Sequence, residues 1–129
     1  MARPVSSNPT AVELQILRIL WELGPSTARR IHERLHSDKG TNYSTTVKML
    51  GVMLEKSLVK RDESASPLVY RAAMTQERAQ KRMLTDLLQS VYEGSSKSLV
   101  MHALSAGRAS REELEEIRRM LDQLEGDQP

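Results

Sequence analysis

The sequence predicts a mainly α-helical protein, with three helices and a β-hairpin in its first part and only helices in its second part. Hydrophobic residues make up 39% of the 129 residues, but aromatic residues only 3%, and Phe is absent. The core is therefore aliphatic, which favours packed helices over a large sheet. Apolar residues also recur at helical spacing through most of the chain. The exception is residues 58–73, where two short runs rich in branched side chains indicate strands.

The first two helices have clear start and stop signals. The first begins near Thr10, where Thr10 and Glu13 form a capping-box pattern. It ends at Gly24, which takes a left-handed cap conformation, and Pro25, which cannot continue a helix. Its apolar stripe consists of Leu14, Ile16, Leu17, Leu20, Trp21 and Leu23. The second helix begins near Ser26 or Thr27 and is expected to bury Ala28, Ile31 and Leu35; residues 37–42 form a turn.

A third helix and a hairpin complete the first part. The helix spans residues 44–56, with Ser44 as its expected cap and Val47, Leu50 and Leu54 as its buried edge. The runs 58–63 and 68–73 form the hairpin, which must pack against the helices because an isolated hairpin is unstable in water. This order is that of a winged helix-turn-helix, in which the third helix enters the DNA major groove and the hairpin is the wing.

The second part, residues 75–125, is predicted to be a helical dimerisation region. Its first helix is capped by Thr75, and its last begins with a capping box of Ser110 and Glu113. Both carry apolar seams that the small winged-helix part cannot cover, which predicts a homodimer. The expected interface residues are Met83, Leu87, Leu88, Val91, Leu114, Ile117, Leu121 and Leu124. The predicted organisation is a polar arm (1–9), the winged helix (10–74), this region and a tail (126–129).

The charge distribution and the composition limit the classes of function that the protein can have. Residues 1–75 carry 11 Lys and Arg against 7 Asp and Glu, a net charge of +4, whereas residues 76–129 carry 8 against 10, a net charge of −2. A basic first part suits a polyanion such as double-stranded DNA. The chain has no Cys, which excludes disulfides and thiolate metal sites. No membrane-length apolar segment or apolar signal region is present, which predicts a cytoplasmic protein.

Residues 32–36 read HERLH, the H-E-x-x-H pattern of zinc proteases. A zinc protease also needs a third protein ligand and a substrate cleft. The one remaining histidine, His102, lies in the other part of the chain, and Leu35 is needed in the core. We therefore predict no metal site, no catalytic residue and no cofactor.

The candidate DNA-binding residues come from the second helix, the third helix and the wing. Arg29 and Arg30 occupy the first turn of a helix, where the helix dipole disfavours cations unless a phosphate faces them; solvated side chains are an equal alternative. The hydroxyls of Ser44, Thr45 and Thr46 are suited to base edges or phosphates, and Lys48 to phosphate or guanine. The wing adds Lys60, Arg61 and Arg71.

Three segments, LWELGPSTARRIHERL, NYSTTVKMLGVMLEKSLVKRDES and LVYRA, together resemble the penicillinase-repressor (BlaI/MecI/CopY) family over about Val12 to Leu124. The resemblance implies a winged helix followed by a helical dimerisation region. It also implies a repressor that binds an inverted-repeat operator as a homodimer, typically with TACA/TGTA half-sites. By this resemblance Tyr43, Ser44, Thr45 and Lys48 occupy the DNA-reading positions.

The sequence departs from the family pattern at several positions. Ser57 stands where the family usually has Gly, so the turn into the wing must tolerate a side chain, and Thr46 stands where an apolar residue is common. The Asn–Phe bond cleaved in β-lactam-responsive members corresponds here to His102–Ala103, which leaves a regulatory membrane-bound protease as an open partner. The Cys-rich tail of copper-sensing members is missing. A winged-helix protein-interaction module without DNA contact remains the alternative function.

Overall fold

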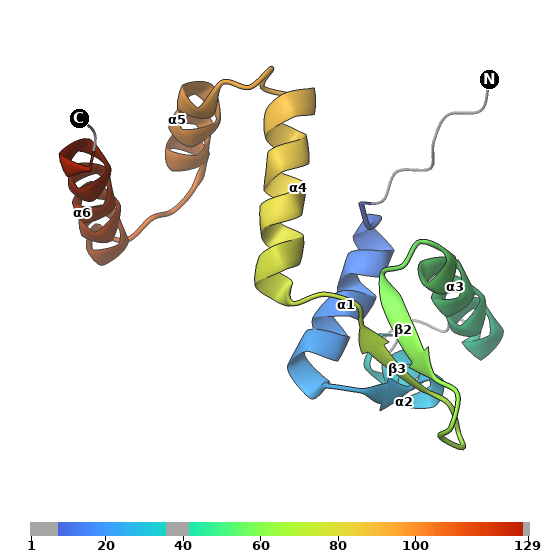
Figure 1. The fold of residues 1–129 in the computed structure, drawn as a ribbon. Helices are drawn as coiled ribbons and strands as arrows, with labels where there is room; N and C mark the ends of the chain where they lie inside the picture. The colour runs from blue at the N-terminus through green and yellow to red at the C-terminus, as the bar shows by residue number, and fades with distance from the viewer. Residues whose placement is uncertain (1–7, 36–41, 128–129) are drawn as a thin grey trace, which may run out of the picture. The chain divides into compact units, whose positions relative to one another are not determined.

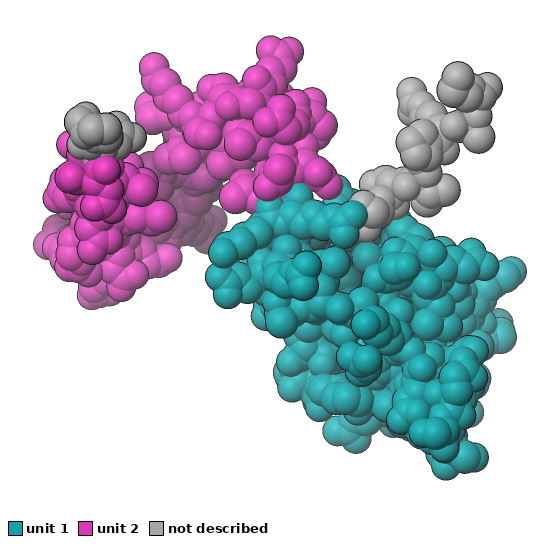
Figure 2. All heavy atoms as spheres, viewed as in Figure 1, with its two compact units in different colours: residues 1–83 teal, residues 84–129 magenta. Residues whose placement is uncertain are grey.

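The computed structural model describes residues 8–35 and 42–127 of the chain (Figure 1). The elements follow in the order α1 (Ala11–Leu23), β1 (Ser26–Thr27), α2 (Ala28–Leu35), α3 (Tyr43–Glu55), β2 (Val59–Asp62), β3 (Val69–Ala72), α4 (Gln76–Ser90), α5 (Ser96–Ala106) and α6 (Arg111–Gly126). Two compact units contain residues 1–83 and 84–129 (Figure 2). The predicted fold class, mainly helices with a small antiparallel sheet, is confirmed. Within the described ranges, no helix is long and apolar enough to cross a membrane.

The first unit is built around an aliphatic core that α1, α2, α3 and the hairpin share. The capping box that starts α1 is confirmed: the Thr10 amide donates to Glu13 Oε1 at 2.9 Å, and the Glu13 amide donates to Thr10 Oγ1 at 3.2 Å. Gly24 ends the helix with a φ of 82° and a ψ of −168°, a positive-φ conformation that glycine tolerates but not the left-handed helical cap predicted there. The core consists of Ile16, Leu17, Leu20, Ala28, Ile31, Leu50, Met53, Leu58, Val59 and Tyr70.

The sheet has three strands rather than the two of the predicted hairpin, in the order β1-β3-β2. Ser26 and Thr27 pair with Tyr70 and Val69 of β3, so α2 begins at Ala28, after the residues where the sequence placed its start. The Thr27 hydroxyl still accepts a hydrogen bond from the Arg30 amide at 3.2 Å, as a capping residue does. Residues 26 and 27 form a strand because the backbone of β3 lies beside them and pairs with them. The local sequence pattern does not show that pairing, because β3 is more than 40 residues away in the chain.

The buried face of α3 differs from the predicted one. Thr46, Leu50 and Met53 are buried at i, i+4 and i+7, whereas Val47, expected at the buried edge, is 39% exposed. The helix begins at Tyr43 with Asn42 at its N-cap position, so Ser44 is not the cap. Thr46 has a place in the core because its hydroxyl has a hydrogen-bond partner there.

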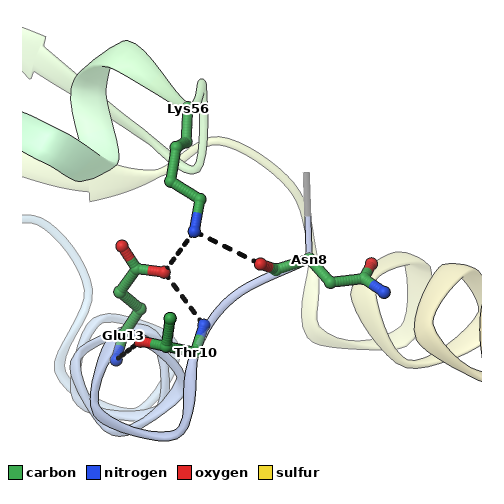
Figure 3. A network of polar contacts seen from close by, with 4 residues as sticks. All are labelled: Asn8, Thr10, Glu13 and Lys56. Atoms are coloured by element: carbon green, nitrogen blue, oxygen red, sulfur yellow. Dashed lines mark hydrogen bonds and ion pairs between the residues drawn. The ribbon is translucent and has the colours of Figure 1, made fainter. Parts of the chain in front are cut away.

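A buried ion pair joins the C-terminal end of α3 to the start of α1 (Figure 3). Lys56 Nζ donates to Glu13 Oε1 at 2.6 Å and to the Asn8 carbonyl at 3.3 Å, and the side chains of Lys56 and Glu13 are only 12% and 5% exposed. Burial raises the pKa of Glu13, but the hydrogen bond and charge of Lys56, with hydrogen bonds from Thr10, outweigh it, so the net pKa is lowered. The pair fixes where α3 ends and the wing begins.

The next residue, Ser57, makes the turn into the wing. Its φ is 61°, in the left-handed region that favours glycine. The family pattern usually has Gly at this position, and the sequence predicted that the turn must tolerate a side chain. Ser57 makes the turn, but its side chain strains the backbone at this φ.

The helices of the second part form where the sequence predicts them. Thr75 Oγ1 accepts from the Arg78 amide at 3.2 Å, and α6 begins with the predicted capping box of Ser110 and Glu113. The first compact unit reaches past the expected boundary at residue 75 because Ala79, in the first turns of α4, is buried in it. Large apolar side chains are exposed on all three helices beyond this point: Leu84 and Leu87 on α4, Val100, Met101 and Leu104 on α5, and Met120, Leu121 and Leu124 on α6. Val91, predicted as part of the α4 stripe, is also exposed but lies in the turn after α4 ends at Ser90.

Candidate nucleic-acid interface

The exposed face of α3 begins with short polar side chains. Ser44, Thr45 and Lys48 are exposed, as a helix that reads DNA requires, while the opposite face of the helix is buried in the core. Val47 lies among them, and its methyl groups are suited to a thymine methyl rather than to the core. Sequence reasoning missed Val47 because its spacing to Leu50 and Leu54 also fits a buried stripe.

Thr46 is a correction to the predicted site. Its side chain is 0% exposed, and its Oγ1 forms a 2.8 Å hydrogen bond with Nδ1 of His32 in α2. A side chain inside the core cannot reach a base or a phosphate. The usual apolar residue at this position in the family was the signal that pointed to burial.

Arg29 and Arg30 have different surroundings although they are adjacent in the first turn of α2. The guanidinium carbon of Arg29 lies 4.2 Å from the centre of the Tyr43 ring, a cation–π contact that joins α2 to α3. Arg30 is exposed and extends from the same turn. The sequence offered two alternatives for this pair, contact with a phosphate or simple solvation. Arg29 makes a third kind of contact, with the Tyr43 ring, that neither alternative included.

A shallow hollow of about 220 Å³ lies between the start of α2, the start of α3 and the wing. Arg29 and Tyr43 line it, as do Val47 and, from the hairpin, Leu68 and Tyr70. Of the predicted α2 and α3 site residues, the structure thus brings Arg29 and Tyr43 together in one hollow that the wing borders. Leu68 was not a predicted site residue, and its 36% exposure is visible only in the fold.

The three wing cations do not share one face of the hairpin. The pairing of Lys60 with Arg71, and of Arg61 with Tyr70, puts Arg61 on the face of the buried Tyr70 and the other two cations on the opposite face. All three cations are exposed. Only Arg61 therefore lies on the side of the sheet that packs towards the helices.

Acidic groups near the wing tip offset the charge of Arg61. Its Nη2 and Nε donate to Glu63 Oε1 at 2.7 and 3.0 Å, and hydrogen bonds from Arg61 to Glu63 and Tyr70 raise the pKa of the guanidinium. The Asp62 carboxylate accepts from the Ser64 hydroxyl and amide at 2.6 and 3.0 Å, which lowers its pKa. Two carboxylates, Asp62 and Glu63, therefore lie beside Arg61 in the wing.

Residues 32–35 of the HERLH motif are described, but its second histidine, His36, lies outside the described residues. His32 is partly buried and engaged with Thr46, and its ring meets the Tyr43 ring edge-on with centres 5.6 Å apart. In ranges 8–35 and 42–127, no three His, Cys, Asp or Glu side chains are grouped to hold a metal ion.

Three helices with a wing, and a third helix that exposes a polar face, define a protein of the winged helix-turn-helix class. The sequence model of the penicillinase repressor family matches residues 9–123, and the chain belongs to this family, whose members are transcriptional regulators and not enzymes. The methicillin resistance regulatory protein MecI of Staphylococcus aureus strain N315 is 20% identical over 113 residues, which cover 88% of this chain and 92% of that protein. The penicillinase repressor of Staphylococcus aureus is 21% identical over 112 residues, covering 87% and 89%.

Proposed function

We propose that the protein is a transcriptional repressor that binds an inverted-repeat DNA operator as a homodimer. The observation that carries this proposal is the division of α3 into a buried face and an exposed polar face within a chain of a repressor family. By the resemblance, the half-sites are of the TACA/TGTA type. Because such a repressor acts on bacterial DNA, we place it in the cytoplasm.

In this proposal α3 supplies the sequence reading. Ser44 and Thr45 stand at the N-terminal end of the helix, the end that contacts base edges in helix-turn-helix proteins, and Lys48 follows one turn later. A lysine there pairs with guanine O6 and N7 or with a phosphate. Val47, exposed between them, adds an apolar contact that favours thymine.

Phosphate contacts come from the cations that flank α3. Arg30 extends from the start of α2, where backbone amides also favour a phosphate. On the wing, Arg61 reaches a phosphate only when Glu63 gives up part of its bond to the guanidinium. Lys60 and Arg71 lie on the opposite face of the hairpin, so we assign them a smaller share of the binding.

The homodimer is supported by the apolar faces of the second unit. Leu87 of α4 and Val91, which directly follows α4, are 43% and 63% exposed, and Leu121 and Leu124 of α6 are 52% and 51% exposed. Side chains of this size exposed along whole helix faces mark an interaction surface. A two-fold partner would cover them and present two α3 helices to the two halves of a palindrome.

The test is a DNA titration of three variants with the same loss of charge. A binding site is first selected from a genomic fragment pool, and Lys48→Ala, Arg61→Ala and the control Lys97→Ala are then compared by gel shift at several salt concentrations. Lys48→Ala weakens the selected site by about 1–3 kcal/mol and relaxes its sequence preference if Lys48 pairs with a base. Arg61→Ala weakens all sequences alike and reduces the salt slope, whereas Lys97→Ala, in α5 of the second unit, changes neither.

Equal loss of preference in the Lys48 and Arg61 variants would refute this division of roles. A wild-type protein that binds no fragment, even at low salt, would instead support the alternative of a protein-interaction module, because phosphate neutralisation makes DNA affinity strongest there.

A further inference from the structure

Among the residues that the structure describes, no side chain caps the N-terminal end of α3, the end that faces DNA in the proposed function. Asn42 occupies the N-cap position but makes no side-chain hydrogen bond to the helix. The other helices with an N-cap residue assigned, α1, α5 and α6, each have one: Thr10, Ser95 and Ser110 accept from a backbone amide. A helix end without such a bond frays more readily. Because Asn42 supplies no cap, other contacts must hold the start of α3 in place.

Two side chains of α2 contact the first residue of α3 from different directions. The Arg29 guanidinium lies over the face of the Tyr43 ring at 4.2 Å, and the His32 ring meets the same ring edge-on, with an interplanar angle of 83° and centres 5.6 Å apart. Arg29 and His32 are one helical turn apart, so they project from the same side of α2. Tyr43 is held by a face contact and an edge contact, and it packs against the core as well.

His32 makes a second contact, one turn further along α3. Its Nδ1 lies 2.8 Å from Thr46 Oγ1, and Thr46 is fully buried. A buried hydroxyl is costly unless it is hydrogen-bonded, so the position of Thr46 depends on His32. An apolar pair at these two positions would pack in more than one rotation of α3, whereas a hydrogen bond has a directional requirement. The contact therefore fixes the rotation of α3 about its own axis.

We propose that Arg29 and His32 are positioning residues for sequence reading, which hold Tyr43 and Thr46 and so set the orientation of the α3 face that carries Ser44 and Lys48. This inference rests on the proposed DNA-binding function. It assigns Arg29 a role that its charge alone does not fulfil, because a guanidinium over an aromatic face also stacks on the ring, which a lysine ammonium does not do. Loss of either contact lowers discrimination between DNA sequences more than it lowers binding to DNA in general.

The test compares substitutions that keep or remove one property at a time. Arg29→Lys keeps the charge but loses the planar group. Thr46→Val removes the hydroxyl at nearly constant shape, and Thr46→Ser retains it. Each variant is titrated with the selected site, with the same site carrying one mismatch, and with unrelated DNA, at several salt concentrations. Thermal melting verifies that all variants are folded at the temperature used.

We expect Arg29→Lys to lower the ratio of mismatched to selected Kd by about two- to fivefold, the range of an exposed cation–π contact. Thr46→Val lowers this ratio by about fivefold or more, the range for removing one partner of a hydrogen bond, here the Thr46 hydroxyl that meets His32 Nδ1. Neither changes the salt slope, and Thr46→Ser stays within about twofold of the wild type. The proposal is overturned if Arg29→Lys keeps full discrimination or if the two Thr46 variants behave alike.

A second measurement separates this proposal from the function on which it rests. Urea unfolding of His32→Leu, Thr46→Val and the double variant forms a double-mutant cycle that involves no DNA. Coupling between the two positions supports the contact, and additive effects overturn it. If the cycle shows coupling but the wild type binds no DNA sequence preferentially, the proposed function has failed, and the assignment to sequence reading fails with it.

Discussion

The buried pair of Lys56 and Glu13 gives the sharpest stability prediction. Lys56→Met keeps most of the volume of the side chain but leaves the Glu13 carboxylate, 5% exposed, without its cation. At 2.6 Å and an effective dielectric constant of 20, the gross attraction is about 6 kcal/mol, most of which desolvation offsets. Removing one partner of a buried pair costs about 3–5 kcal/mol. Because Thr10 still donates to Glu13, we expect about 2–4 kcal/mol.

Urea unfolding followed by tryptophan fluorescence measures this cost. Trp21 is the one tryptophan of the chain, and its Nε1 donates to the Met74 carbonyl at 2.9 Å, so it reports on the first unit. The matched control is Lys81→Met, because Lys81 forms an exposed ion pair with Glu77 that is worth under about 0.5 kcal/mol. The double variant Glu13→Gln with Lys56→Met is expected to be more stable than Lys56→Met alone, since it leaves no unpaired charge.

The same pair predicts a pH dependence with a definite sign. The pKa of Glu13 is lower in the folded protein than its ordinary value. The carboxylate therefore contributes stability that is fully present above the unfolded pKa of about 4.3 and is lost as the pH falls through the folded value. The stability difference between the wild type and Glu13→Gln must shrink in that acidic window. The reasoning is refuted if Lys56→Met costs no more than Lys81→Met, or if the effects of the Glu13 and Lys56 substitutions add.

Three further predictions concern the wing, the turn before it and the assembly. Glu63→Gln frees Arg61 for phosphate and steepens the salt slope of DNA binding by up to about 0.9 in a titration series; an unchanged slope contradicts this. Ser57→Gly relieves the φ of 61° and stabilises the protein in urea by up to about 1 kcal/mol, and Ser57→Val destabilises it; the opposite order would show no strain there. Ile117→Asp with Leu121→Asp abolishes the dimer in sedimentation at micromolar concentration, and a variant that stays dimeric would disprove the interface.

Local signals in the sequence determine where most helices and strands lie. The Thr10–Glu13 and Ser110–Glu113 capping boxes each concern residues within one turn of each other, and both are present as predicted; α1 also ends at Gly24 as predicted. The change of period at residues 58–73 likewise identifies β2 and β3. The order of the elements, three helices and then a hairpin, is that of a winged helix-turn-helix, and in that class the third helix exposes the side chains at its start. The exposure of the polar side chains at the start of α3 could therefore be predicted from the order alone. These features depend on neighbours in the chain, so the sequence contains them directly.

Tertiary structure decided which side chains of each helix and strand are buried and which are exposed. Thr46 was expected to contact DNA, yet it is buried because His32, fourteen residues away, supplies its hydrogen-bond partner. Lys56 looks like an ordinary helix-end lysine, and only the approach of Glu13, 43 residues earlier, makes it a buried ion. The strand at residues 26 and 27 exists only because β3 returns beside it. Such contacts depend on residues that the fold brings together from distant positions, and spacing along the chain does not encode which of them will meet.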